Sequence, residues 1–213
     1  MNKRNHKPKR QNHLILMAKT PKQGLVKTRL AHGIGWGKAT HFYRHTTTRL
    51  ITQLSQDPRW LTCIAITPDA NKKNWPWPLH VRTEPQGPGD LGARMTRLFK
   101  RHAPNPTLII GTDIPEISAT AIQEAFKALN KTGFVLGPSG DGGYWCVGQN
   151  NSPTPLNIFH NVRWSTEHTL KDTTANIPPT KLTHLTYDLQ DIDTKQDFTK
   201  ISRVTKNRWI RSN

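Results

Sequence analysis

The chain has 213 residues and a formal net charge of +17, from 31 lysines and arginines against 14 aspartates and glutamates. This length suits one well-cored domain, or at most two small ones. No apolar stretch approaches the roughly 20 residues that cross a bilayer, which argues against a membrane-spanning protein. The N-terminal residues are basic and polar without an apolar segment, so we expect no secretory signal.

The two cysteines, Cys63 and Cys146, lie in strand-like runs with neither metal-ligand spacing nor a disulfide framework. This pattern favours a reducing, cytoplasmic setting. The positive charge predicts attraction to polyanions: nucleic acid, an anionic membrane or phosphorylated substrates. Its dense clusters fall at the two ends, which we interpret as a basic flexible extension over residues 1–12 and a basic tail over residues 207–213.

The first third of the chain alternates apolar runs with helical patterns. Residues 13–18 (HLILMA) form a continuous apolar run typical of a buried strand. A loop is expected over residues 19–35. A helix over residues 36–56 follows, ended by an Asp-Pro pair. Two strands are then expected, over residues 61–67 and 79–83.

The middle of the chain continues the alternation. Asp90 is the expected N-cap of a helix with a regular apolar face. A strand over residues 107–110 runs into Gly111-Thr112-Asp113, and Ser118 is expected to cap the next helix. Strands over residues 134–136 and 144–147 flank a glycine-rich loop.

A helix over residues 165–176, a strand over 182–187 and a helix over 194–205 complete the pattern. This alternation predicts one α/β domain over residues 13–206, with a mostly parallel sheet and helices on both faces. Ligands of such sheets bind at the carboxyl ends of the strands. The loop that follows the first strand and the segment around Asp113 both fall at that edge.

The loop after the first strand is rich in cations. Lys19, Lys27 and Arg29 lie in it together with Gly24 and Thr28. Free backbone N–H groups combined with lysine and arginine suit phosphate. The spacing differs from that of a Walker loop, and a basic surface loop would have the same composition.

The scarce carboxylates follow strands. Asp113, beside a glycine, suits a Mg²⁺ or Mn²⁺ ion held between protein and diphosphate, although an aspartate that only caps a turn would look the same. Asp191 and Asp193 alternate along an extended segment and therefore point the same way, which is costly unless a cation lies between them. We expect Thr194 and Asp197 to cap the last helix, so capping does not explain the other two.

Two glycine-rich segments remain. Residues 137–144 (GPSGDGGY) hold four glycines around Asp141. This composition fits either a long hairpin loop or a backbone that leaves clearance for a bulky ligand. Residues 86–95 form a glycine-bounded helix start that either meets a nucleobase, ribose or phosphate or is simply capped. Arg94 lies one turn into that helix, on the same side as Asp90.

In this order the segments resemble one family, the radical-SAM/selenodomain-associated transferases (DUF2064), also described as glycosyltransferases. Six motifs carry the resemblance and span residues 14 to about 200. They are MAKxP with GxVKTRL in residues 17–30, QGxGDLGxRM in 86–95, GTDxP in 111–115, LGPxxDGGY in 136–144, WST in 164–166 and DxDT in 191–194.

The resemblance implies a three-layer GT-A-like (Rossmann-like) fold of the nucleotide-diphospho-sugar transferase superfamily, which also contains guanylyltransferases. It implies that Lys19, Lys27 and Arg29 bind nucleotide phosphates, and that Asp113 binds the metal, with Asp191 or Asp193 as a second ligand. GT-A enzymes often carry an Asp-x-Asp motif, whereas residues 112–115 supply one aspartate.

Further contacts are predicted from the loop and helix-start segments described above. The nucleotide or its phosphates are expected to meet Gly24, Thr28, Gly89, Asp90 and Arg94. The substrate is expected to meet Gly142, Gly143, Tyr144 and Trp164. We expect Asp113 and Asp141 to act in catalysis.

Three functions fit these residues. The first is transfer of a sugar from a nucleotide-diphospho-sugar to a small acceptor, with cations stabilising the departing diphosphate and Asp141 as general base or hydroxyl acceptor. The second is nucleotidyl transfer from an NTP to a phosphorylated acceptor through the same loops. The third, suggested by charge, is non-enzymatic nucleic-acid binding, although no recognition motif is present. The family resemblance favours the first.

Overall fold

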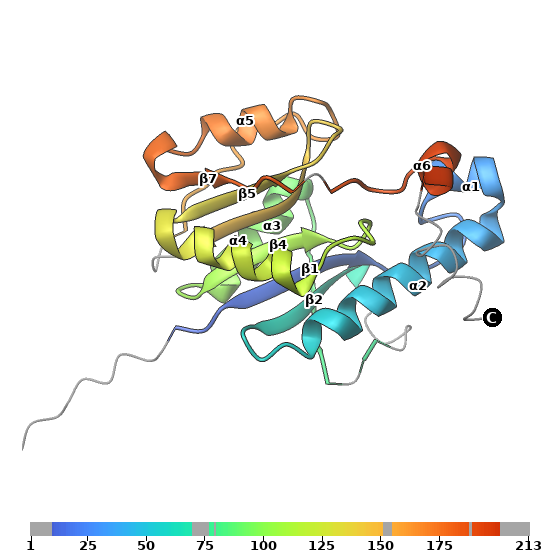
Figure 1. Ribbon diagram of the computed structural model, residues 1–213, viewed down its shortest axis with the longest axis horizontal. Coiled ribbons are helices and arrows are strands. Elements are labelled where there is room, and N and C mark those ends of the chain that lie inside the picture. The colour runs from blue at the N-terminus through green and yellow to red at the C-terminus, as the bar shows by residue number, and fades with distance from the viewer. Residues whose placement is uncertain (1–9, 70–76, 79, 151–154, 188, 201–213) are drawn as a thin grey trace, which may run out of the picture.

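The computed structural model describes residues 10–69, 77–78, 80–150, 155–187 and 189–200 (Figure 1). The strands are β1 (His13–Lys19), β2 (Leu61–Thr67), β3 (Arg82–Pro85), β4 (Pro106–Gly111), β5 (Phe134–Pro138), β6 (Tyr144–Asn150) and β7 (Leu182–His184). The helices are α1 (Thr28–Ile34), α2 (Trp36–Ser55), α3 (Leu91–His102), α4 (Ala119–Thr132), α5 (Thr169–Ala175) and α6 (Lys195–Lys200), with a 3-10 turn over Pro179–Lys181. The expected tail over residues 207–213, most of the extension over 1–12 and the end of the last expected helix lie outside the described residues.

The strands form one seven-stranded sheet in the order β3-β2-β1-β4-β6-β5-β7. β1 pairs in parallel with β2 and β4, β2 with β3, and β5 with β7. β6 is antiparallel to both of its neighbours. The mostly parallel α/β sheet expected from the sequence is therefore confirmed, and the ends of β1, β2 and β4 meet at one edge.

Alternating side chains of the strands pack into two cores, one on each face of the sheet. Leu14 and Leu16 of β1 face the core that α2 and α4 cover. Ile15, between them, faces the core that α3 and α5 cover. This is the period of two that a strand buried on both faces requires. Figure 1 shows α2 and α4 on one side of the sheet and α3 on the other, which confirms the three layers.

One helix was not expected. The predicted loop over residues 19–35 contains α1, whose Leu30 and Ala31 pack in a third, smaller core with Phe42 of α2 and Phe198 of α6. A helix of seven residues is too short for a clear periodic pattern, and its N-cap residue, Lys27, makes no side-chain capping bond. The sequence therefore carried no start signal for it.

Most other elements agree with the expectation within a few residues. Asp90 accepts a hydrogen bond from the Ala93 N–H (2.8 Å), and Ser118 caps α4 in the same way. Thr194 and Asp197 exchange the expected capping bonds. β3 begins later than predicted, β7 ends earlier, and α5 begins only at Thr169.

The C-terminal part of the described chain returns to the sheet's carboxyl edge. An extended segment leads from β7 to α6, which lies beside α1 (Figure 1). The rings of Phe42 and Phe198 meet there with centroids 5.3 Å apart. This return brings Asp191 and Asp193 to the first loop.

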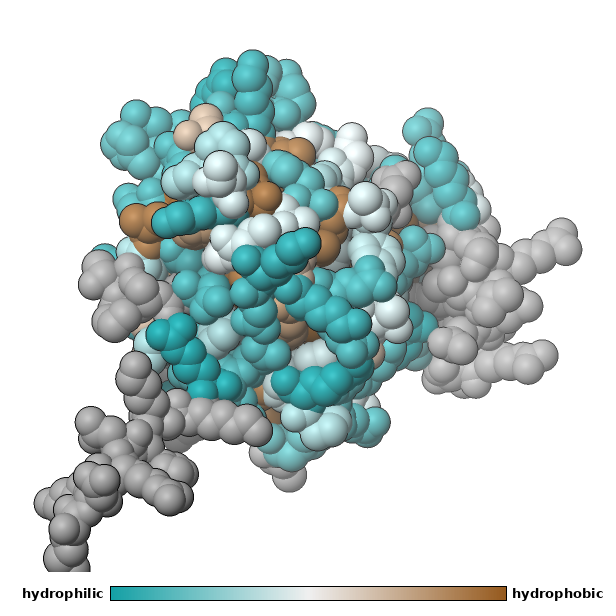
Figure 2. All heavy atoms as spheres, turned by 60° about the vertical axis from the view of Figure 1, so that its left-hand side comes forward, coloured by the Kyte–Doolittle hydropathy of each residue, from teal (hydrophilic) through white to brown (hydrophobic). Residues whose placement is uncertain are grey.

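The outer surface is mainly hydrophilic. Apolar areas are scattered over the face turned to the viewer in Figure 2. Among the described residues, none of the helices combines the length and the apolar character that crossing a membrane requires.

Candidate functional site

A cavity of about 580 Å³ opens at the carboxyl ends of β1, β2 and β4. Four basic side chains line it: Lys19, Lys27, Arg29 and Arg94. Three carboxylates line it as well: Asp113, Asp141 and Asp193. Thr28, Tyr144 and Ser165 add polar groups. All six sequence motifs thus contribute lining residues to this one cavity. The WST motif contributes Ser165.

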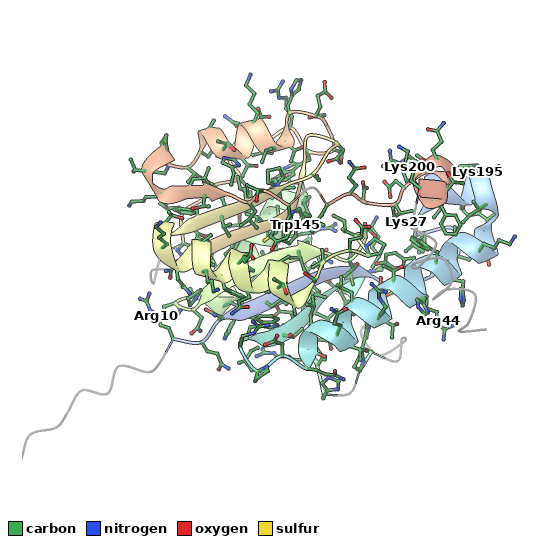
Figure 3. All side chains as sticks on the ribbon, in the orientation of Figure 1. Arg10, Lys27, Arg44, Trp145, Lys195 and Lys200 are labelled. Carbon is green, nitrogen blue, oxygen red and sulfur yellow. The ribbon has the colours of Figure 1, made fainter. Side chains whose placement is uncertain are left out.

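Lys27 lies at the centre of the charges. Its backbone is left-handed, with φ 48° and ψ 44°, and its side chain is only 3% exposed. The ammonium Nζ lies 2.7 Å from Asp193 Oδ1 and 3.4 Å from Asp113 Oδ1. Burial alone would lower the pKa of Lys27, but the charges of these aspartates raise it above its ordinary value. Lys27 therefore stays protonated and joins two segments far apart in sequence (Figure 3 labels it beside α1).

Asp191 and Asp193 differ in their surroundings. Asp193 forms ion pairs with both Lys27 and Arg29. Burial would raise the pKa of Asp193, but these two cations hold it below its ordinary value. Burial, and then the charge of Asp193, raise the pKa of Asp191 to about 6. The sequence predicted a cation beside these two aspartates. Lys27 and Arg29 lie there, and both form ion pairs with Asp193.

Asp191 lies in a smaller pocket of about 280 Å³ that adjoins the cavity. Arg29, Asp141 and Asp193 line both pockets. The smaller pocket therefore extends the cavity past the carboxylate of Asp141.

Tyr43 of α2 was not predicted and holds two strand ends together. Its hydroxyl accepts a hydrogen bond from the Lys19 N–H (2.8 Å) and lies 3.4 Å from the Thr112 hydroxyl. Burial raises the pKa of Tyr43, so the hydroxyl stays protonated. Lys19 and Asp113, the residue after Thr112, are therefore fixed relative to each other. The only sequence signal was an aromatic residue next to the apolar face of a helix.

The start of α3 supplies Arg94 to the cavity. Arg94 Nε donates to the Gly89 carbonyl at 2.9 Å, and Asp90 caps the helix beneath it. Gln86 is buried and donates to backbone carbonyls of β1 (3.2 Å) and β2 (2.8 Å), which fixes the preceding loop. Gly89 and Asp90 thus hold Arg94 in place and are not themselves among the lining residues.

Gly24 also lies outside the cavity lining. It adopts φ +82° in a turn, and an added Cβ would meet no atom within 4 Å. Its glycine is explained by backbone conformation, which a side chain would strain.

The glycines of residues 137–144 make room for protein atoms. The segment is the hairpin loop between β5 and β6. A Cβ on Gly142, whose φ is +81°, would lie 2.4 Å from the Glu167 carbonyl oxygen. A Cβ on Gly137 would lie 2.4 Å from the Trp145 ring, and one on Gly140 would lie 3.0 Å from Gln190. Contacts with protein atoms explain these glycines, which favours the hairpin-loop interpretation over clearance for a ligand.

Asp141 is held at the tip of this hairpin. Its Oδ1 accepts hydrogen bonds from the Ser139 hydroxyl (2.6 Å) and the Gly143 N–H (3.0 Å). The carboxylate lines the cavity, whereas Gly142 and Gly143 do not. Tyr144, at the start of β6, lines the cavity as expected.

Trp164 packs away from the cavity. Its ring lies 5.8 Å from that of Phe159, and a Cβ on Gly92 of α3 would come within 2.7 Å of it. It joins the core on the α3 side of the sheet. Ser165, the next residue, lines the cavity instead.

Comparison with known proteins gives a family and a fold. Residues 50–166, more than half of the chain, match the model of DUF2064, an uncharacterized protein conserved in bacteria. This range contains four of the six sequence motifs; those in residues 17–30 and 191–194 lie outside it. No curated protein matches the chain.

Solved structures resemble the whole domain. A candidate nucleotide-diphospho-sugar transferase from Desulfovibrio desulfuricans G20 is 26% identical, with a TM-score of 0.82 over 95% of this chain and 94% of that chain. The 4-diphosphocytidyl-2C-methyl-D-erythritol synthase of Anaerococcus prevotii DSM 20548 is 13% identical, with a TM-score of 0.54 over 95% and 99%. Rv0371c of Mycobacterium tuberculosis H37Rv is 12% identical, with a TM-score of 0.51 over 90% and 97%. The last two share the fold alone, and together these likenesses confirm the expected GT-A-like architecture.

Proposed function

The chain belongs to the DUF2064 family of bacterial proteins, and we propose that it transfers a sugar from a nucleotide-diphospho-sugar donor to a small acceptor. One observation carries the proposal: a single cavity at the strand ends gathers four basic side chains and three carboxylates. This is where an α/β sheet binds its ligands. The Desulfovibrio protein, similar over nearly the whole chain, supports the choice of donor.

The basic side chains divide into two roles. Lys19 and Arg94 line the cavity without an ion pair to its carboxylates and would bind the diphosphate. Arg29, paired with Asp193 yet exposed over most of its side chain, would reach the same phosphates. Lys27 is nearly buried and would act mainly by holding Asp113 and Asp193 in position.

The carboxylates suit a hard divalent cation. Asp113 is 51% exposed, and only its Oδ1 approaches Lys27. Mg²⁺ and Mn²⁺ prefer such oxygen ligands and usually take one or two carboxylates together with substrate phosphates. Asp113 would therefore hold the ion, with Asp193 or Asp191 as the second carboxylate. When bound, the ion would neutralise charge that develops on the leaving diphosphate.

Asp141 would serve the acceptor. In the proposed reaction an acceptor hydroxyl oxygen bonds to the anomeric carbon while the bond to the diphosphate breaks. The hydroxyl proton passes to the carboxylate of Asp141, which Ser139 and Gly143 orient. Lys19, Arg29 and Arg94 stabilise the nucleoside diphosphate that leaves.

Product analysis tests the proposal. The protein is incubated with a panel of nucleotide sugars and, separately, with NTPs, with Mg²⁺ or Mn²⁺ and with phosphorylated and unphosphorylated acceptors. Release of nucleoside diphosphate from a nucleotide sugar is expected. Release of pyrophosphate from an NTP would instead support nucleotidyl transfer.

Thermal unfolding with each nucleotide provides a test that needs no acceptor. A ligand that binds the folded state raises the melting temperature by mass action. If no nucleotide raises it, with or without metal, both transferase readings fail. Salt-dependent RNA binding by the same protein would then favour the charge-based alternative.

A further inference from the structure

A second group of reactive side chains lies deep in the molecule, away from the cavity. Cys63 of β2, Glu84 of β3 and His102 of α3 place their ligating atoms within 4.8 Å of one another. The three residues are 4%, 3% and 8% exposed. Leu91, at the other end of α3, lines the cavity, so the two sites are about 16 Å apart along that helix.

We propose that Cys63, Glu84 and His102 bind Zn²⁺ at a site independent of the transferase reaction. Thiolate, carboxylate and imidazole together are typical zinc ligands, whereas Mg²⁺ and Mn²⁺ favour the all-oxygen set of the cavity. Zinc bonds of about 2.0–2.3 Å at tetrahedral angles separate ligand atoms by about 3.3–3.8 Å. The three ligand atoms lie within 4.8 Å of one another, so a contraction of at most about 1 Å would bring them into this range.

The His102 side chain needs little movement to accept the ion. Its Nε2 lies 2.9 Å from Glu84 Oε1, a hydrogen bond that the metal would replace. The two atoms would separate by about 0.4 Å to reach the spacing of two zinc ligands. The thiol proton of Cys63 would leave to solvent as the metal binds.

The surrounding residues resemble the outer shell of a metal site. His13 Nδ1 lies 2.8 Å from His102 Nδ1, so the His102 ring can donate to His13 while its Nε2 binds metal. Arg101 lies 2.9 Å from Glu84 Oε2 and leaves Oε1 available. Arg101 also donates to the Pro85 carbonyl at 3.1 Å. The ligands thus come already oriented.

The ion would join three elements. β3 has four residues and is one of the two edge strands of the sheet, and His102 is the last residue of α3. Through the ion, Glu84 of β3 and His102 of α3 would both be linked to Cys63 of β2. This would fix β3 and the end of α3 on the sheet. A hydrogen-bonded network of Arg101, Glu84, His102 and His13, which the Cys63 thiol joins at Glu84, would pair most of these polar atoms but leaves Glu84 Oε2 without a hydrogen bond. The metal affinity of Cys63 separates the two explanations. A thiol adds little to such a network but is a strong zinc ligand as thiolate.

Cobalt provides a spectroscopic test on the full untagged chain. The protein is stripped with a chelator, dialysed and titrated with Co²⁺, then with Zn²⁺. We expect a thiolate-to-cobalt charge-transfer band that saturates at one equivalent and disappears when Zn²⁺ is added. The Asp113→Asn protein should give the same band, which separates this site from the cavity.

Variants identify the ligands. Cys63→Ser should abolish the band, whereas the matched control Cys146→Ser, at a strand cysteine that is 0% exposed, should retain it. His13→Ala should keep the band and weaken Zn²⁺ binding about 10–100-fold. A wild-type protein without the band, or a band that survives Cys63→Ser, overturns the proposal. If Cys63→Ser does not fold, His102→Gln replaces it, and a retained band there is equally decisive.

Discussion

The cavity buries a positive charge, whereas the cluster of Cys63, Glu84 and His102 buries a negative one. In the cavity the hidden partner is a cation, because the Lys27 side chain is 3% exposed while that of Asp113 is 51% exposed. In the cluster the buried partner is a carboxylate, because the side chain of Glu84 is 4% exposed while that of Arg101 is 32% exposed. A buried charge that loses its partner costs far more than an exposed one. Removing a carboxylate from the cavity should therefore leave a buried cation unpaired, whereas removing the cation from the cluster should leave a buried carboxylate unpaired.

The difference also shows where the scarce acids are used. Five of the 14 acidic residues line the cavity or the adjoining pocket: Asp113, Asp141, Asp191, Asp193 and Asp197. Two of them, Asp113 and Asp193, form ion pairs with Lys27, in a chain whose net charge is +17. Carboxylates gathered in one cavity suit a divalent cation and ligand hydroxyls, whereas Glu84 lies apart from them in the cluster proposed to bind zinc.

The largest expected effect is on activity and comes from Asp113→Asn. Loss of charge stabilisation at the leaving group should lower turnover by about 10²–10³-fold. Because Asp113 is half-exposed, the free energy of unfolding should change by less than about 1 kcal/mol. Initial rates of nucleoside diphosphate release and urea unfolding followed by tryptophan fluorescence measure both. Undiminished turnover would remove Asp113 from the proposed metal site.

Asp193→Asn should have the largest effect on stability. It leaves the buried Lys27 ammonium with the more distant carboxylates of Asp113 and Asp191, which should lower the free energy of unfolding by about 3 kcal/mol. Asp113→Asn is the matched control, because it removes the same charge from the other partner of the same lysine. If the control is the more destabilising of the two, the assignment of Asp193 as the main partner is wrong.

Arg101→Gln tests the cluster by removing a cation instead of a carboxylate. Here the exposed cation is removed, and the buried Glu84 keeps His102, at 2.9 Å, and the weak thiol donor of Cys63. We expect a loss of about 2 kcal/mol in the free energy of unfolding. Lys100→Gln, which removes the same charge from the neighbouring exposed position of α3, should be nearly neutral. Equal losses in the two variants would mean that net charge, and not the Glu84 contact, controls stability.

The strands and helix starts were largely predictable from the sequence. Strands buried on both faces show continuous apolar runs, and β2 matches its expected bounds. Asp90 and Ser118 mark the starts of α3 and α4 in the sequence, because capping is a local interaction. α1 was missed because its stability depends on Phe42 and Phe198, the second of which lies far along the chain.

The candidate site was predictable only in part. Asp113 could be placed because it follows a buried strand, and Arg94 because it lies one turn into a helix whose start Asp90 marks. The pairing of Lys27 with Asp193 could not, since 166 positions separate them. The cluster of Cys63, Glu84 and His102 has no recognisable spacing, because three separate elements supply it. The contact between Gly142 and the Glu167 backbone could not be predicted either, because Glu167 lies outside the glycine-rich segment.

The smallest expected effect depends on pH and concerns Asp191. Burial and the charge of Asp193 raise the pKa of Asp191 from 3.8 to about 6. Between these values the folded protein holds a proton that the unfolded chain releases, so the contribution of Asp191 to stability falls as pH rises through this window. Asp191→Asn should therefore be more stable than the wild type at pH 7, by about 1 kcal/mol after allowance for its partial exposure.

The advantage of Asp191→Asn should disappear as the pH falls towards about 4, the ordinary range of an aspartate. Glu84 should behave in the opposite way. Burial would raise its pKa, but His102 and Arg101 hold it below its ordinary value, so its contribution is present at neutral pH and is lost in acid. Urea unfolding of Asp191→Asn, Glu84→Gln and the wild type from pH 4 to 7, in the presence of a chelator, compares the two. Stability differences that change in the same direction for both variants would contradict the opposite placement of charge in the two regions.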